Sequence, residues 1–131
     1  MAGEFFVMER LFRLGHEPAL TLGNAKSIDI IVRTSAGKLK TVSVKSARGG
    51  GKWGVDKHSL SENESRDLVF VFLLYKSFED VASDPLVWIM KATDVEKRKR
   101  PWFDKSAIYY SHRQNTAADL EEFKNAWHHI A

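Results

Sequence analysis

The sequence predicts a mixed α/β fold in which helices flank a central β-sheet. Apolar residues recur at helical spacing near both ends of the chain, whereas the middle holds apolar, β-branched runs of strand length. The chain has 131 residues, of which 44% are hydrophobic, and this is enough for one ordinary core but not for two. We therefore expect a single domain that spans residues 1–131.

The chain is expected to begin with a helix over residues 3–14. Its apolar side chains recur at spacings of three and four residues, and Gly15, followed closely by Pro18, ends it. Two strands follow, at 27–32 and 41–46, with a glycine-containing bend between them. This pattern predicts a β-hairpin directly after the first helix.

The second half begins with a glycine-rich loop over 49–54, and the polar stretch 59–66 extends it, with a short helix at its end. Strands are predicted at 68–75 and 86–90, and the first is apolar almost throughout, which is typical of a central strand covered on both faces. Thr116 can cap a last helix. This helix carries one apolar stripe, formed by Leu120, Phe123, Trp127 and Ile130.

Composition excludes several classes of protein. Cysteine is absent, so a disulfide framework, a thiolate metal site and a cysteine nucleophile are excluded. The longest apolar run, 68–75, is too short to cross a membrane, and we expect a cytoplasmic protein. A net charge of +3 and a pI of about 9.2 permit contact with phosphate backbones through local patches. The densest patch, 97–100, is either a solvated loop or part of such a contact surface.

Three common site motifs do not occur in the sequence. A phosphate-binding loop would need glycine in place of Ser46 and a hydroxyl in place of Trp53, so no nucleotide cofactor is expected. The five histidines lack metal-ligand spacing. No Gly-x-Ser-x-Gly segment is present, which excludes that form of serine hydrolase.

Two charges within the predicted hairpin need an explanation. Asp29 lies among the apolar residues of the first strand and Lys45 among those of the second, with Gly37 at the bend between them. Antiparallel pairing would bring both side chains to one face of the sheet. A carboxylate there can hold a divalent cation, and an ammonium can stabilise charge on a phosphate. The alternative is a salt bridge that fixes the hairpin register.

The order of charged residues along the first half of the chain is informative. Three charged residues occur in this order. Glu4 lies in the first predicted helix, Asp29 lies in the strand segment Ile28-Asp29-Ile30-Ile31, and Lys45 lies in the next strand segment, Val42-Ser43-Val44-Lys45-Ser46. This arrangement resembles the restriction-endonuclease-like superfamily, also called PD-(D/E)XK. It is similar above all to the archaeal Holliday-junction resolvases and to related small bacterial nuclease-like proteins. The resemblance implies a restriction-endonuclease-like fold with a mixed central β-sheet flanked by helices.

The resemblance also implies a site. Glu4 matches the helix glutamate, Asp29 the metal-binding aspartate and Lys45 the catalytic lysine, while the Val44 carbonyl would join the carboxylates around Mg²⁺ or Mn²⁺. Ser43 stands where the family has its second acid, and a hydroxyl is a weaker ligand than a carboxylate. The implied activity is therefore that of a metal-dependent DNA endonuclease, a hydrolase of phosphodiester bonds. The alternative is a catalytically inactive nuclease-fold protein that binds nucleic acid or a protein partner.

Three explanations of Ser43 remain open. Glu9, Glu17 or Asp56 can supply the missing carboxylate from another element. Alternatively the remaining ligands and water suffice for Mg²⁺, which usually keeps several waters. In the third explanation the protein has lost cleavage and only binds.

The residues after the lysine strand are expected to contact substrate. Arg48 and Lys52 would bind phosphate, and Trp53 would either stack on a base or anchor the loop in the core. The resemblance further implies DNA as the partner and a possible homodimer.

Overall fold

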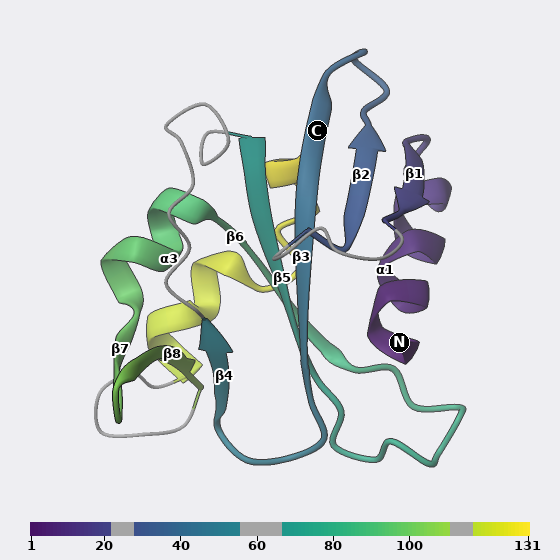
Figure 1. The fold of residues 1–131 in the computed structure, drawn as a ribbon. Coiled ribbons are helices and arrows are strands. Elements are labelled where there is room, and N and C mark those ends of the chain that lie inside the picture. Colours follow the sequence, from purple (N-terminus) through teal and green to yellow (C-terminus); the bar gives the residue numbers. More distant parts are fainter. Residues whose placement is uncertain (22–27, 56–66, 111–116) are drawn as a thin grey trace.

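The computed structural model describes residues 1–21, 28–55, 67–110 and 117–131. It contains a mixed five-stranded sheet (Figure 1). Two clusters of buried apolar side chains lie on the two faces of this sheet. The strands of this sheet, in spatial order, are β1 (Glu17–Leu20), β2 (Ile30–Arg33), β3 (Leu39–Ala47), β5 (Leu68–Leu74) and β6 (Leu86–Lys91). Only the β3–β5 pair is parallel; the other neighbours are antiparallel.

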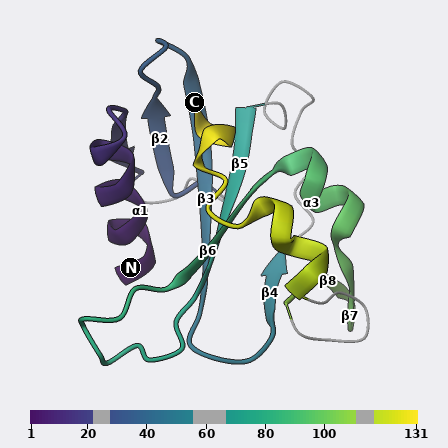
Figure 2. The ribbon, with the colours of Figure 1, turned by 180° about the vertical axis from the view of Figure 1, so that it is seen from behind.

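A second, three-stranded sheet lies on the other side of the molecule from the first helix (Figure 1). In spatial order it contains β4 (Lys52–Val55), β8 (Lys105–Tyr109) and β7 (Arg100–Trp102). The helical segments are α1 (Ala2–Arg13), α3 (Ala92–Arg98) and two 3₁₀ helices, η1 (Ala117–Phe123) and η2 (Trp127–Ile130). The 3₁₀ helices pack against β6, as the view from behind shows (Figure 2).

Strand β5 is the centre of the main sheet. All of its residues are buried, because α1 and η2 cover one face and β4, α3 and η1 cover the other. This confirms the prediction of a central strand covered on both faces. The predicted first helix, the hairpin strand at 41–46 and the strand at 86–90 are also present, with boundaries shifted by a few residues.

The glycine-rich segment ends earlier than predicted. Lys52–Val55 forms β4 and pairs with β8, whereas a loop was expected through residue 54. The cause is tertiary packing: the Trp53 ring is buried and the Trp102 ring covers Gly54, where an added Cβ would lie 2.9 Å from that ring. Strand pairing and packing therefore override the preference of this glycine-rich segment for a loop.

The prediction of a last α-helix is wrong, but most of the side chains that it placed in the core are buried. Two 3₁₀ helices replace one α-helix, and Asn125, with φ of 54°, interrupts them while its backbone N–H donates to the Val87 carbonyl at 3.0 Å. Leu120, Phe123 and Ile130 are buried as predicted. The expected Thr116 cap and the short helix near 66 lie outside the described residues.

Within the described ranges, no helix is long and apolar enough to span a membrane.

Candidate functional site

The site begins where β2 and β3 separate. Ile30 is the first residue of β2 in register with β3, and it faces Val42. Asp29, one residue earlier, donates its backbone N–H to the Val42 carbonyl at 2.9 Å and accepts at its own carbonyl from Thr21. Its carboxylate Oδ2 accepts a hydrogen bond from the Val44 N–H at 2.7 Å. The Asp29 side chain thus continues the hydrogen-bonding pattern of β3 where β2 no longer does.

This hydrogen bond places the carboxylate at the peptide group between Ser43 and Val44. Backbone groups of successive residues point to opposite neighbours in a strand, so those of Val42 and Val44, two residues apart, both face the β2 side. The Val44 carbonyl consequently lies along the same edge as the Asp29 carboxylate. Two oxygen donors therefore lie on the β2 side of β3 where the strands diverge.

Ser43 is completely buried, with 0% exposure, on the face of β3 opposite to Val42 and Val44. It is in register with Phe70 of β5, and its Oγ has no hydrogen-bond partner among the residues that the structure describes. A buried hydroxyl without a partner destabilises the fold by about 1–3 kcal/mol. The position that the resemblance gives to an acid therefore carries an unsatisfied oxygen.

Lys45 lies on the same face of β3 as Ser43, beside Phe72 of β5. Its side chain is half-buried, and within the part of the chain that the structure describes it forms no salt bridge or hydrogen bond. The alternative in which Asp29 and Lys45 form a register-fixing salt bridge is therefore wrong. The ammonium is left available for another anion.

Glu4 lies in the first turn of α1, which packs closely on β3. An added Cβ on Gly3 would be 2.2 Å from the Ser46 Oγ and 3.3 Å from Val44, so only glycine allows this approach. The Glu4 carboxylate is 3.7 Å from the N-terminal amine and is 19% exposed. Burial raises the pKa of the Tyr75 hydroxyl, and the nearby charges of Glu4 and Asp84 add to this effect. Glu4 therefore lies near the end of β5, and no hydrogen bond or ion pair joins it to Asp29 or Lys45 among the described residues.

The proposed substitutes for the missing acid lie elsewhere. Glu9 forms ion pairs with Arg10 and Arg13 and is rotated by about 140° around α1 from Glu4. Glu17 pairs with Arg33 at the far end of β2, about 13 Å along the strand from Asp29. Asp56 lies outside the described residues.

The candidate donors around the divergence are all oxygen atoms: the Asp29 carboxylate, which accepts from the Val44 N–H, and, on β3, the Val44 carbonyl and the buried Ser43 hydroxyl one residue earlier. Hard cations such as Mg²⁺ prefer oxygen and usually keep several waters, so this donor set fits such an ion. Among the described residues, however, no group of three or more histidine, aspartate or glutamate side chains can hold a metal. The single carboxylate makes the fit a weak one.

The residues expected to bind substrate differ in their accessibility. Arg48 is exposed, and its guanidinium lies 3.6 Å from the centre of the Phe78 ring. Lys52 is exposed as well, 4.9 Å from the centre of the Trp102 ring. Trp53 is only 3% exposed and donates its indole N–H to the Leu73 carbonyl at 2.8 Å. Of the two alternatives for Trp53, the structure supports the core anchor, because a buried ring offers no face to a base.

The basic run 97–100 is not a plain solvated loop. It covers the last turn of α3 and the start of β7, and Arg98 and Lys99 form ion pairs with Glu122 and Glu96 at 2.7 and 2.9 Å.

The hairpin that follows, β7–β8, was not predicted from the sequence. Its strands are short, and Pro101 and Trp102 do not give the alternating pattern of a half-buried strand.

The fold has a counterpart among solved structures. The chain is similar to a bacterial homing endonuclease, I-Ssp6803I, with a TM-score of 0.63 and 17% sequence identity over 98% of this chain and 88% of that chain. At this identity the similarity shows the fold alone: a nuclease-like mixed α/β fold with a central mixed sheet. No protein-family model and no curated protein sequence matches the chain.

Proposed function

We propose that the protein is a metal-dependent DNA endonuclease of the restriction-endonuclease-like class, which hydrolyses phosphodiester bonds where β2 and β3 diverge. The observation that carries the proposal is the Asp29 carboxylate, which accepts a hydrogen bond from the Val44 N–H at 2.7 Å, next in sequence to Lys45, a lysine with no partner among the described residues. Its support from outside the chain is the shared fold with a homing endonuclease.

The Asp29 carboxylate, the Val44 carbonyl and the Ser43 hydroxyl would hold Mg²⁺ or Mn²⁺, with Glu4 contributing directly or through water. Such an ion supplies Lewis-acid stabilisation of charge on the phosphoryl oxygens. The hydrogen bond from Val44 fixes the orientation of the Asp29 carboxylate before any ligand binds, which lowers the reorganisation needed on binding.

Lys45 acts as the cationic group of the site. Its ammonium has no partner among the described residues, so it can donate to a water molecule or to a phosphate oxygen. Because Lys45 is in register with the buried Phe72 and is itself half-buried, the charge acts in a medium of lower polarity than bulk water. There it orients the attacking water or stabilises negative charge that develops on the phosphate.

A specific observation favours a second candidate function, that of an inactive nuclease-fold protein that binds nucleic acid or a protein partner. Ser43 is neutral, and the described residues contain no cluster of three metal-binding side chains. Both facts lower the expected metal affinity. Weak binding of the ion would abolish cleavage but leave the binding of nucleic acid or of a protein partner intact.

A cleavage assay separates the two functions. We would incubate supercoiled, linear and branched DNA with Mg²⁺ or Mn²⁺ and compare the parent with Asp29→Asn, Lys45→Ala and the control Lys38→Ala, an exposed lysine in the β2–β3 turn. The nuclease proposal predicts cleavage by the parent and the control only. Cleavage that survives Asp29→Asn and Lys45→Ala would place the activity at another site, and binding without cleavage by the parent would favour the second function.

The role of Ser43 has its own test. Ser43→Glu adds a carboxylate next to Asp29 and should tighten Mn²⁺ binding in calorimetry, whereas Ser35→Glu in an exposed turn should not. Equal Mn²⁺ affinity in the parent and Ser43→Glu would count against a metal site at this point. The homodimer expected from the resemblance is checked by sedimentation of the same proteins.

A further inference from the structure

The turn between β7 and β8 carries an unusual surface side chain, that of Phe103. Phe103 is 92% exposed, and its backbone has φ of 54°. Bulky residues rarely adopt positive φ, which favours glycine or asparagine. Phenylalanine at this position is thus unfavourable for folding stability in two ways, because its ring is exposed to water and because its backbone has a positive φ. Strained residues of this kind are concentrated at binding sites.

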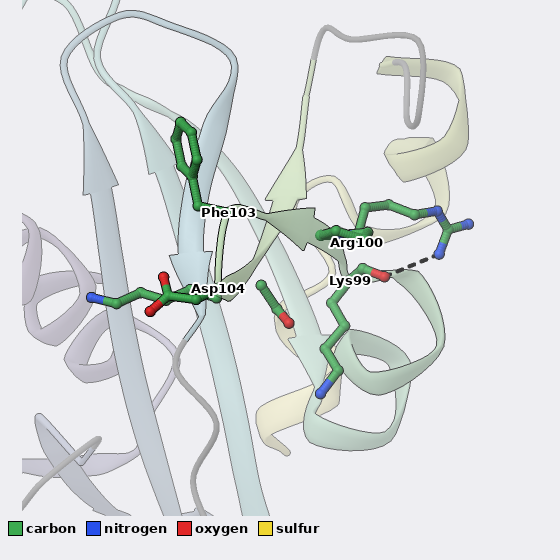
Figure 3. Close-up of a pocket in the computed structure, with 7 residues that line it drawn as sticks. Lys99, Arg100, Phe103 and Asp104 are labelled. Carbon is green, nitrogen blue, oxygen red and sulfur yellow. Dashed lines mark hydrogen bonds between the residues drawn. The ribbon is translucent and has the colours of Figure 1, made fainter.

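The turn is held rigidly enough to present this ring. Tyr109 of β8 donates its hydroxyl to the Pro101 carbonyl at 3.0 Å, which ties the two strands of the hairpin together. Lys52, the first residue of β4, lies over the Trp102 ring, with its Nζ 4.9 Å from the ring centre. Phe103 projects away from the strand pair at the tip of this hairpin (Figure 3).

A surface pocket of about 380 Å³ lies beside the ring (Figure 3). Its volume is in the range of small-ligand sites. Three cationic side chains, one carboxylate and one hydroxyl contribute to its wall; the lining residues are Lys99, Arg100, Pro101, Phe103, Asp104, Lys105 and Ser106. The Arg100 guanidinium is fixed by a hydrogen bond to the Lys99 carbonyl at 3.1 Å. The excess of positive charge favours an anionic ligand.

We propose that the β7–β8 hairpin binds an unpaired nucleotide of a DNA strand. Phe103 stacks on the base, while Arg100 and Lys105 contact the flanking phosphates. An exposed aromatic ring among cations is the combination that binds single-stranded nucleic acid, because every base has a face to stack and every nucleotide carries a phosphate. A fully paired duplex keeps its bases stacked on one another and offers no such face to Phe103. The choice of DNA as the occupant rests on the proposed function.

Binding measured without divalent metal tests the hairpin apart from cleavage. Fluorescence anisotropy in EDTA would compare a duplex that contains one bulged nucleotide with the same duplex fully paired. We expect the parent to bind the bulged duplex about tenfold more tightly, within the range known for one base stacked on an aromatic ring. Phe103→Leu keeps an apolar side chain without the ring and should bind both duplexes equally, whereas Phe103→Trp should keep the preference. Phe12→Leu is the matched control, because Phe12 is an exposed phenylalanine on α1.

A fluorescent base analogue at the bulge gives a second measurement. Its emission should be quenched on binding to the parent and to Phe103→Trp, and much less by Phe103→Leu. Lys105→Ala should weaken binding to both duplexes by similar factors, because a phosphate contact carries no information about pairing.

Each outcome decides between the two proposals. Equal affinity of the parent for both duplexes, or a preference that persists in Phe103→Leu, would overturn the role of the hairpin while leaving a DNA nuclease possible. Failure of the parent to bind either duplex in EDTA would overturn the role of the hairpin, whereas the nuclease proposal stands or falls with cleavage in Mg²⁺ or Mn²⁺. If sedimentation shows a parent dimer that Phe103→Leu converts to a monomer, the tip is a protein interface and the assignment to DNA is wrong.

Discussion

Substitution of Asp29 separates the structural role of its carboxylate from its proposed chemical role. The carboxylate accepts a hydrogen bond of 2.7 Å from the Val44 N–H at a part-buried position. Hydrogen bonds to a charged group contribute about 1.5–3 kcal/mol, and a buried donor left without an acceptor destabilises by a similar amount. Asp29→Ala should therefore lower the free energy of unfolding by about 2 kcal/mol. Asp29→Asn keeps an oxygen acceptor and should lower it by about 1 kcal/mol or less.

Cleavage should respond differently. Both Asp29→Ala and Asp29→Asn remove the anionic ligand, so both should abolish metal-dependent cleavage although their stabilities differ. Urea unfolding followed by tryptophan fluorescence gives the stabilities, and nicking of supercoiled DNA in Mg²⁺ gives the activity. Asp84→Asn is a suitable control, because this exposed aspartate pairs with Arg10 at 2.9 Å outside the site. A surface pair of this kind contributes about 0–1 kcal/mol.

Two results would refute this reasoning. Equal stability of Asp29→Ala and Asp29→Asn would mean that the bond to Val44 contributes nothing, and the carboxylate would not be held at the divergence of the strands. Full nicking activity in Asp29→Asn, with Lys45→Ala also active, would mean that the divergence is not the catalytic site.

Three further predictions concern the framework around the site. Gly3→Ala should lower the free energy of unfolding by about 1–2 kcal/mol in urea, because its Cβ would lie 2.2 Å from the Ser46 Oγ, and Ser46→Ala should restore part of the loss. Trp53→Phe should lower it by about 2–3 kcal/mol, since it leaves the Leu73 carbonyl without its 2.8 Å donor and opens a cavity. Burial lowers the pKa of His129 below the 6.5 of an unfolded chain. As the pH falls through 6.5, the His129 of the unfolded chain therefore takes up a proton before that of the folded chain, and the free energy of unfolding should decrease. His129→Gln should flatten that decrease in urea unfolding measured at several pH values.

The main sheet could be predicted because its strands carry strong local signals. Residues 68–74 are apolar throughout, and β2 begins with three β-branched residues, of which Ile30 and Val32 are buried. The second sheet could not be predicted in this way. Trp53 and Gly54 form β4 only because β8 pairs with them and Trp102 covers Gly54, and those partners are about fifty residues further along the chain.

For the candidate site, the sequence predicted which elements carry the residues but not which contacts they make. The sequence placed Asp29 and Lys45 on neighbouring strands, and the structure brings Asp29 to the backbone of β3. Sequence spacing could not show that the Asp29 carboxylate accepts a hydrogen bond from the Val44 N–H and forms no ion pair with Lys45. This depends on the residue at which the pairing of β2 with β3 begins. The exposed ring of Phe103 was missed for a related reason, since a single aromatic residue in a turn has no periodicity to reveal it.

The burial of Ser43 bears on why a neutral residue stands at this position. Its side chain is completely buried in register with Phe70, and ionised carboxylates in such surroundings are strongly destabilising unless a cation pairs with them. A glutamate here would therefore make folding depend on bound metal, whereas the serine limits the unfavourable contribution to one unsatisfied hydroxyl. Metal should consequently stabilise Ser43→Glu against urea far more than it stabilises the parent, because a ligand stabilises a fold in proportion to the logarithm of its concentration over its dissociation constant. Equal stabilisation of the two proteins by Mn²⁺ would show that the buried oxygen at this position does not face the metal site.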